Sequence, residues 1–180
     1  MVAASASRSR PPLLIDIGTG SGAILLACLH RLPGWRGFGT DPSAAAMAWA
    51  RRNRDALKFD DRAALLRGDL CQALRPGSAD FVVSNPPYIR REELADLAPE
   101  IREHEPREAL DGGEDGLEVV RRLIPGAAAA LRPGGWLALE LAPDQPETVR
   151  ALLADRGDFD SLRIFQDLAA RPRGVLARRV

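Results

Sequence analysis

The sequence contains little cysteine and has no excess of either charge. Its two cysteines, Cys28 and Cys71, do not have the close spacing of a metal site, so both are expected to be reduced thiols and no metal ion is expected. Basic and acidic residues number 25 each, which leaves no overall field to attract nucleic acid or an anionic membrane. A nucleic-acid substrate would need a local basic patch.

The sequence also lacks a long apolar run. No segment approaches the roughly 18 consecutive apolar residues that a membrane-spanning helix needs. The first ten residues have no apolar centre of the kind found in a signal peptide. We therefore expect a cytoplasmic location without membrane contact, and a disordered tail over residues 1–10. No break in composition divides residues 11–180, so one domain is expected there.

A glycine-rich turn near the N-terminus organises the rest of the sequence. Residues 13–17 form an apolar run of buried-strand length, and residues 23–29 are typical of a helix. Between them lie Gly18, Gly20 and Gly22. Glycine permits positive φ and lets a ligand lie directly against main-chain atoms, and the N–H groups of the following helix would face that ligand. The alternative is an ordinary glycine-rich connection in an α/β protein.

Acidic residues follow the next two predicted strands. Residues 35–40 are expected to form a strand that ends at Asp41, about 20 positions beyond the glycine turn, where a carboxylate typically holds the hydroxyl pair of a ribose. A helix is expected from Pro42 onward, so Asp41 has the alternative role of a helix cap. Asp69 follows the predicted strand 63–66, at the edge where ligands collect in parallel sheets. The alternative for Asp69 is a solvated loop position.

The tetrapeptide from Asn85 to Tyr88 is the most specific chemical signal. It directly follows the predicted strand 79–84. Pro86 and Pro87 fix φ and remove two donors, which leaves the carbonyl oxygens of Asn85 and Pro86 without a neighbouring N–H. The Asn85 side chain adds an acceptor and a donor, and Tyr88 adds a flat aromatic face. Such a site accepts two hydrogen bonds from a planar amino group, whereas the alternative is a structural turn.

Strand and helix patterns alternate along the remaining sequence. Residues 89–111 are charged and lack a clear apolar period, which predicts a long loop with one helical turn at 92–97, placed as a lid or substrate platform. The further elements expected are a helix over 117–128, a turn at 132–135, strands over 136–141, 161–166 and 174–178, and a helix over 145–154. Pro125 is expected to bend or split the first of these helices. The pattern predicts an α/β fold with a parallel sheet, helices on both faces and an antiparallel pair of last strands.

Taken together, these motifs resemble those of class I S-adenosylmethionine-dependent methyltransferases. The segment Asp-Ile-Gly-Thr-Gly-Ser-Gly at 16–22 carries this likeness, together with Asp41 and Asp69. A narrower likeness is to the HemK/PrmC-type protein-glutamine N5-methyltransferases, which modify peptide chain release factors. It is carried by the segments 84–89, 104–117 and 167–179.

The resemblance implies a Rossmann-like fold with a seven-stranded, mostly parallel sheet and an antiparallel C-terminal hairpin. It implies S-adenosyl-L-methionine as cofactor, S-adenosyl-L-homocysteine as product, and a release factor glutamine as substrate. The glycines would line the methionine end, Asp41 would hold the ribose, Asp69 would approach the adenine amine, and Asn85 with the Pro86 carbonyl would bind the substrate amide. The expected cofactor-binding residues are Asp16, Gly18, Thr19, Gly20, Gly22, Asp41, Pro42, Asp69, Leu70 and Asn85. The expected catalytic residues are Asn85, Pro86, Pro87 and Tyr88.

Two departures and two rival functions accompany the resemblance. Family members usually carry a helical N-terminal domain that helps to dock the release factor, so an additional domain or a partner chain is left open here. The segment 140–145 lacks the glycine expected after its glutamate. A DNA or RNA base is the rival substrate, since its exocyclic amino group is also planar, but the neutral net charge disfavours it. The second rival, a binding module without catalysis, is disfavoured by the intact Asn-Pro-Pro-Tyr.

Overall fold

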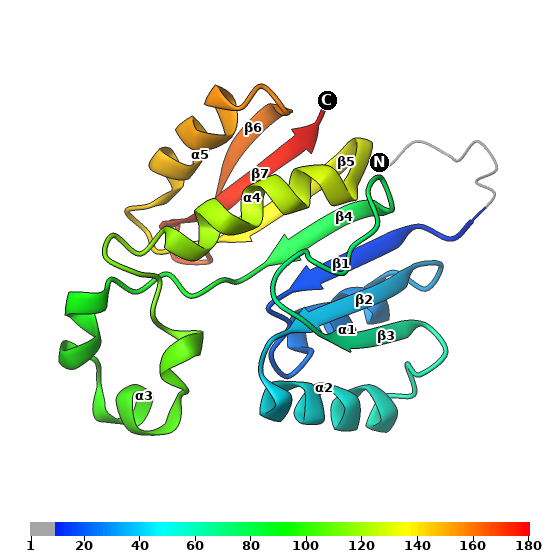
Figure 1. Cartoon of the computed structure of the whole chain (residues 1–180), viewed down its shortest axis with the longest axis horizontal. Helices are drawn as coiled ribbons and strands as arrows, with labels where there is room; N and C mark the ends of the chain where they lie inside the picture. The colour runs from blue at the N-terminus through cyan, green and yellow to red at the C-terminus, as the bar shows by residue number, and fades with distance from the viewer. Residues whose placement is uncertain (1–9) are drawn as a thin grey trace.

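The computed structural model describes residues 10–180, so the tail expected over residues 1–10 lies, except for Arg10, outside the described residues. A seven-stranded sheet has the strand order β3-β2-β1-β4-β5-β7-β6 (Figure 1). The strands are β1 (Leu13–Ile17), β2 (Arg36–Asp41), β3 (Ala63–Arg67), β4 (Ala79–Ser84), β5 (Leu131–Glu140), β6 (Phe159–Gln166) and β7 (Pro172–Arg179). β1 to β5 are parallel, and β7 is antiparallel to both β5 and β6. The expected fold, including its C-terminal hairpin, is confirmed.

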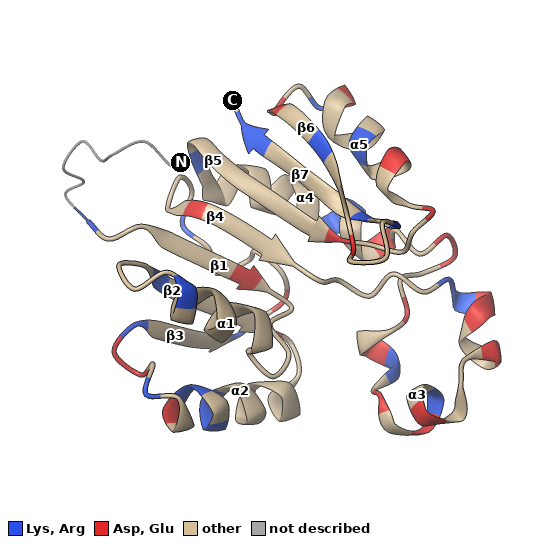
Figure 2. Cartoon of the chain, turned by 180° about the vertical axis from the view of Figure 1, so that it is seen from behind, with Lys and Arg blue, Asp and Glu red and all other residues tan. Residues whose placement is uncertain are grey.

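Helices cover both faces of the sheet. The helices are α1 (Ala23–Arg31), α2 (Ala44–Ala56), α3 (Pro99–His104), α4 (Glu118–Ala130) and α5 (Pro146–Asp155), with short 3₁₀ turns η1 (Arg91–Asp96) and η2 (Arg107–Ala109). α4 crosses one face and α1 lies on the other (Figures 1 and 2). In β1, Ile15 and Ile17 join the core cluster under α4 and α5, whereas Leu14 joins the cluster under α1. This alternation is the two-residue period of a strand that is buried on both faces.

The turn expected at residues 132–135 is instead a bulge inside β5. On β4, Ala79 and Phe81 pair with Leu131 and Trp136 of β5, so the intervening residues of β5 have no counterpart on β4. Gly134 lies in this bulge with φ +76°. The pattern located the irregularity correctly, but the strand continues on both sides of it.

Helix α4 continues through Pro125 without a break, so the expectation that this proline splits the helix is wrong. A proline inside a helix costs about 3 kcal/mol because it lacks an N–H and clashes with the preceding turn. Leu123 and Ile124 are buried against the sheet, and burial of such side chains stabilises by roughly 1.5–3 kcal/mol each. Packing on the sheet therefore outweighs the local cost.

Residues 89–111 contain more helix than expected. The helical turn predicted at 92–97 is present as η1, one residue earlier, but α3 and η2 were not predicted. Pro99 lies in the first turn of α3, where proline is favoured. None of the residues of α3 is buried, so the helix has no apolar stripe by which the sequence could reveal it.

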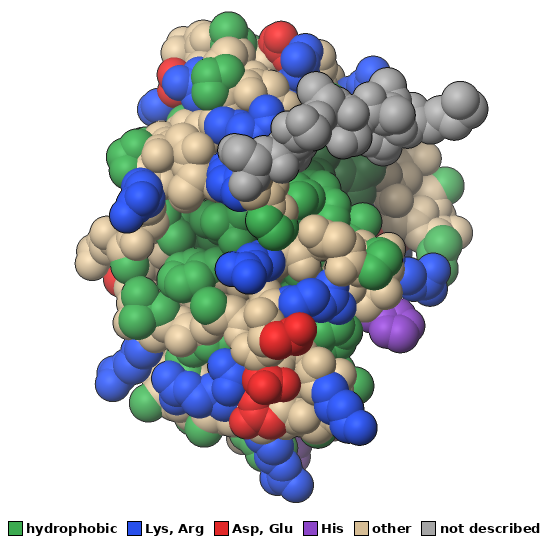
Figure 3. Space-filling view, turned by 90° about the vertical axis from the view of Figure 1, so that its right-hand side faces the viewer, with side chains coloured by type: hydrophobic (Ala, Val, Ile, Leu, Met, Phe, Trp, Pro, Cys, Tyr) green, Lys and Arg blue, Asp and Glu red, His purple; other side chains and the backbone are tan. Residues whose placement is uncertain are grey.

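The parallel strands bring the predicted motifs to one edge of the sheet. Ile17 of β1 pairs with Thr40 of β2 and with Ser84 of β4, so the residues that follow these strands meet at the carboxyl edge. Residues 90–111, which we call the lobe, project from this edge at the left of Figure 1. Figure 3 views the opposite, amino edge, where hydrophobic side chains gather in the middle of the face. Within residues 10–180, no helix combines the length and apolar character needed to span a membrane.

Candidate active site

The glycine turn leaves its main chain open on one side. Gly18, Gly20 and Gly22 have φ values of +69°, +57° and +81°, so each adopts a conformation that favours glycine. A Cβ added to Gly18 or Gly20 would meet nothing within 4 Å. At Gly22 the added Cβ would lie 3.3 Å from Leu26 and 3.6 Å from Ala50. The first two glycines therefore offer free space beside the backbone, and Gly22 allows close packing of α1 and α2.

Asp16 is a buried acid directly beneath this turn. Its carboxylate is 1% exposed, and its Oδ2 accepts hydrogen bonds from the Thr19 hydroxyl at 2.7 Å and from the Leu25 N–H at 3.1 Å. Burial, with a smaller contribution from the nearby Asp41, raises the pKa of Asp16 to about 6 against the opposing effect of these two hydrogen bonds. Oδ1 has no hydrogen-bond partner in the described part of the chain. An unsatisfied buried acceptor is costly, and a donor from a bound ligand would relieve that cost.

Asp41 fastens the end of β2 to the glycine turn. Its Oδ2 accepts the Gly20 N–H at 2.9 Å, and its Oδ1 accepts the Ser43 N–H at 2.8 Å. The capping residue of α2 is Ser43, whose hydroxyl accepts the Ala46 N–H at 3.2 Å. The helix-cap alternative for Asp41 is therefore wrong, and its carboxylate lies beside the open main chain of the turn. Pro42 follows it, and the Pro42 carbonyl accepts a hydrogen bond from Arg67.

Asp69 and Leu70 lie on the loop after β3, at the expected edge. The Asp69 side chain is 39% exposed and forms an ion pair with Arg122 of α4 at 2.5 Å. Leu70 has φ +47°, a strained conformation for a leucine, and its carbonyl accepts the Thr40 hydroxyl at 3.1 Å. Such strain in the backbone is often found at binding sites, because the surrounding structure must enforce it.

Asn85 leaves β4 with an unoccupied carboxamide. It is exposed, while Pro86 is buried and Pro87 and Tyr88 are half-buried. Ser84, immediately before it, donates its hydroxyl hydrogen bond to the Ile17 carbonyl at 2.7 Å and so joins β4 to β1 beside the glycine turn. Within the described residues, neither the Asn85 side chain nor the carbonyls of Asn85 and Pro86 take part in a hydrogen bond. The exposed Asn85 carboxamide is therefore available to a substrate, whereas Pro86 is buried.

Two residues that sequence reasoning did not assign to the site, Arg173 and Gln145, contact Tyr88, and a third, Glu140, binds Arg173. Arg173 donates to the Tyr88 hydroxyl at 2.8 Å and to Glu140 Oε1 at 2.8 Å. Gln145 Nε2 donates to the Tyr88 carbonyl at 2.9 Å. The segments 140–145 and 167–179 were part of the family resemblance, but no pattern in the sequence showed that both meet Tyr88.

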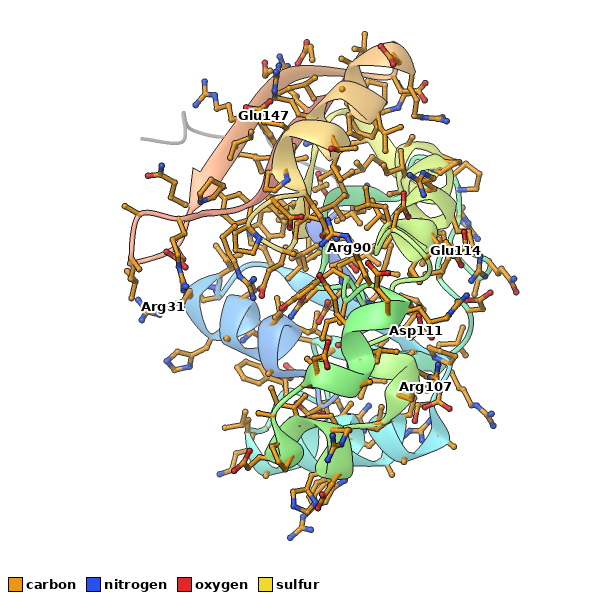
Figure 4. All side chains as sticks on the ribbon, turned by 90° about the vertical axis from the view of Figure 1, so that its left-hand side faces the viewer. Arg31, Arg90, Arg107, Asp111, Glu114 and Glu147 are labelled. Carbon is orange, nitrogen blue, oxygen red and sulfur yellow. The ribbon has the colours of Figure 1, made fainter. Side chains whose placement is uncertain are left out.

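The lobe is a segment whose two ends are hydrogen-bonded to each other and whose residues line a cavity. Its ends are joined by main-chain hydrogen bonds from Ile89 to Leu110 at 3.0 Å and from Gly112 to Ile89 at 2.8 Å. Arg107 Nε and Asp111 Oδ2 lie 3.6 Å apart within the lobe (Figure 4). Arg90, at the base of the lobe, forms an ion pair with Asp144. A cavity of about 350 Å³ inside the lobe is lined by Arg91, Leu94, Ala95, Leu97, Arg102, Glu105, Arg107 and Leu110. Charged residues of both signs crowd onto the lobe (Figure 2).

Neither a metal nor a reactive thiol is built into residues 10–180. No group of three or more His, Cys, Asp or Glu side chains in this range could hold a metal ion. Cys28 and Cys71 are both free. Burial raises the pKa of the Cys71 thiol to about 11, so this thiol is protonated and a poor nucleophile at neutral pH.

Comparison with known proteins shows which sequences this chain is similar to. Residues 8–114 match the family model of the methyltransferase small domain. The chain is 47% identical over 163 residues to a release factor glutamine methyltransferase of Caulobacter vibrioides, covering 91% of this chain and 56% of that protein. It is 46% identical over 172 residues to a protein of the same name from Bradyrhizobium diazoefficiens, covering 96% of this chain and 58% of that protein. The chain thus spans a little over half the length of these relatives.

Solved structures show the same fold at lower sequence identity. The N-terminal domain of human METTL16, solved in complex with SAH, aligns with a TM-score of 0.67 at 22% identity, covering 97% of this chain and 64% of that chain. TrmN from Thermus thermophilus aligns with a TM-score of 0.63 at 22% identity, covering 95% of this chain and 45% of that chain.

Proposed function

Because the chain belongs to the methyltransferase small domain family, we propose that it transfers a methyl group from S-adenosyl-L-methionine to the side-chain amide nitrogen of a glutamine in a peptide chain release factor. The support for the substrate is the name shared by relatives at 46% and 47% identity. A cytoplasmic location is part of the same proposal.

The residues around the glycine turn fit the proposed cofactor. The backbone beside Gly18 and Gly20 is open, and the unpaired Oδ1 of Asp16 is an acceptor suited to an ammonium group. The Asp41 carboxylate would accept hydrogen bonds from the ribose hydroxyls at the end of β2. When bound, the cofactor supplies a sulfonium methyl group that needs no further activation by the protein.

The residues after β4 supply what the acceptor amide requires. A glutamine amide nitrogen is a poor nucleophile because its lone pair is delocalised over the carbonyl. The Asn85 side-chain oxygen and the Pro86 carbonyl would accept hydrogen bonds from its two N–H groups, which orients the nitrogen and stabilises the positive charge that develops on it. The Tyr88 ring would pack against the plane of the amide. A nucleophilic side chain has no part in this scheme.

One observation carries the proposal. The Ile17–Ser84 pairing sets the residue after β1 beside the residue after β4, so Gly18 and an exposed, unoccupied Asn85 lie at the same carboxyl edge. The proposed cofactor site and the proposed amide-binding site would therefore be adjacent. This adjacency is what a direct methyl transfer between two bound molecules requires.

A methylation assay with labelled S-adenosyl-L-methionine tests the proposal. Release factor, total RNA and genomic DNA are offered separately, and the modified product is located by mass spectrometry. We expect the label on a glutamine side chain of the release factor. Label that enters only the nucleic acid would contradict the proposal.

A further inference from the structure

We propose that Arg173, Glu140 and Gln145 hold Tyr88 in its working position, and that Arg173 is a positioning residue of the active site. We call these three residues the Tyr88 clamp. This inference deepens the proposed function. Its test by methylation kinetics rests on that function, whereas its test by the NMR signals of the Tyr88 ring does not.

The Arg173 guanidinium holds the tyrosine side chain. Besides its hydrogen bond to the hydroxyl, its central carbon lies 5.2 Å from the centroid of the Tyr88 ring. Both distances together place the guanidinium at the hydroxyl end of the ring, where it can fix the orientation of the side chain and still interact with the ring. Arg173 is itself anchored, because it donates to Glu140 Oε1 at 2.8 Å and to the Leu141 carbonyl at 3.0 Å. Both anchors lie where β5 ends.

Gln145 holds the main chain of the same residue. Its side chain is almost fully buried, and its Nε2 donates to the carbonyls of Tyr88 at 2.9 Å and Gly116 at 3.4 Å. Its Oε1 accepts the Ala142 N–H at 3.0 Å, so both ends of the carboxamide are used. Gly116 has φ +75°, and a Cβ there would overlap the Tyr88 carbonyl. The loop can approach Tyr88 this closely only because residue 116 is glycine.

These contacts differ from those of a tyrosine that only fills a core. Tyr88 is half-buried at the carboxyl edge, three positions after Asn85. Polar groups rather than apolar side chains fix its hydroxyl and its carbonyl, and charged hydrogen bonds of this kind specify orientation strongly. The two ends of one segment both act on this residue, Gln145 directly and Glu140 through Arg173. The clamp thus gives a role to the segment 140–145, which lacks the glycine expected from the family resemblance. In this segment the Ala142 N–H donates a hydrogen bond to Gln145.

Tyr88 is the only tyrosine in the chain, so its ring can be observed without ambiguity. Protein labelled with ¹³C-tyrosine gives one set of ring signals. We expect Arg173→Gln to shift this set, because the variant removes the cation near the ring and the hydrogen bond to the hydroxyl. The matched control is Arg171→Gln, since exposed Arg171 pairs with Asp167 and not with Tyr88. Ring signals that Arg173→Gln leaves unchanged would overturn the clamp.

Kinetics separate a positioning role from a merely structural one. We expect Arg173→Gln to lower kcat for release factor methylation by roughly ten- to hundredfold, as misplacement of a substrate-orienting group does, and to leave cofactor affinity unchanged. Arg173→Lys, which keeps the charge and one donor, should recover part of kcat. If Arg173→Gln does not fold, Glu140→Ala, which removes the side-chain acceptor that anchors the guanidinium, takes its place. Shifted Tyr88 ring signals with an unchanged kcat would overturn the positioning role. If the wild-type protein methylates no release factor, that result counts against the proposed function. The ring signals would then decide alone whether the clamp exists.

Discussion

Asp16 is a residue of the candidate site that lowers the stability of the folded protein when it is ionised. Its carboxylate is buried and half-satisfied, and its pKa of about 6 means that the charged form is disfavoured in the folded protein. Relative to an ordinary value near 3.8, a shift of this size corresponds to about 3 kcal/mol once the group is ionised. Under the proposed function, the ionised acid is the partner of the ammonium group of the cofactor.

This pKa predicts a pH dependence of stability. A carboxyl group whose folded pKa is raised binds more protons in the folded than in the unfolded state between about pH 4 and 6, so the free energy of unfolding falls as pH rises through that window. Asp16→Asn, which has nearly the same shape and cannot ionise, should lack this part of the decline. Urea unfolding of both proteins from pH 4 to pH 7 measures the difference. Parallel curves for the two proteins would contradict the raised pKa.

Substitution of Gly20 should affect ligand binding more than it affects folding stability. An alanine there meets no protein atom within 4 Å but must adopt φ +57°, which costs about 1 kcal/mol. The methyl group would occupy the open space beside the backbone. We expect Gly20→Ala to fold with slightly reduced stability and to bind S-adenosyl-L-homocysteine at least about tenfold more weakly, which corresponds to about 1.4 kcal/mol. Gly34→Ala is the control, since that position has free space and lies in the turn after α1; equal loss of affinity in both variants would exclude a ligand at Gly20.

At the scale of the elements, the C-terminus of α2 carries an unfavourable residue. Lys58 follows the helix with φ +58°, the left-handed conformation in which helices commonly end and in which glycine is preferred. Its side chain is exposed, so little packing would be lost on truncation. We expect Lys58→Gly to raise the free energy of unfolding by about 1 kcal/mol, and Lys58→Ala, which shares the strain, to leave it nearly unchanged. Chemical denaturation of the three proteins checks this, and an equal effect of both substitutions would refute the explanation.

The elements also show which parts of the structure a sequence can reveal. Strand β4 and the expected strand coincide, since a run buried on both faces has a clear signature and Asn-Pro-Pro ends it sharply. Helix α3 escaped prediction because it has no buried face. The continuous α4 shows the reverse case, in which packing on the sheet overrides the proline rule. Local pattern is therefore reliable where burial and local geometry agree.

The same distinction applies to the candidate site. Gly18, Gly20 and Asn85 could be proposed from the sequence because each residue type has a particular backbone or hydrogen-bonding property. Arg173 was missed because its contact with Tyr88 joins residues 85 positions apart and leaves no local pattern. Contacts of this kind depend on how β7 enters the sheet, which only the three-dimensional arrangement shows.

At the scale of the whole molecule, the two faces of the sheet carry the apolar core and its carboxyl edge carries the candidate site. The two faces bury apolar clusters under α1 and under α4 and α5, whereas the glycine turn, Asp41, Asn85 and the lobe share the carboxyl edge. Residues needed for stability and residues offered to ligands are thus mostly different. This arrangement explains how the edge can hold strained and unsatisfied groups while the faces remain well packed.

The balanced charge of the chain predicts how methyl transfer responds to salt. A protein that binds nucleic acid through several phosphate contacts loses roughly 10³- to 10⁵-fold in affinity between 50 and 200 mM salt. With 25 basic and 25 acidic residues, this chain should show only a small change in KM for the release factor over that range. Initial rates at several salt concentrations measure it. A steep loss would favour a nucleic-acid substrate instead.

The most direct test of the account is the effect of Asn85→Ala on binding and transfer measured side by side. Because Asn85 is one of many expected cofactor-binding residues, calorimetry with S-adenosyl-L-homocysteine should show only a small change in Kd. In contrast, kcat for release factor methylation should fall by roughly a hundredfold or more, as when a preorganised hydrogen-bonding group is removed. Gln166→Ala, which removes an exposed carboxamide at the end of β6, should change neither quantity. Unchanged turnover in Asn85→Ala would contradict the claim that this carboxamide holds the substrate amide.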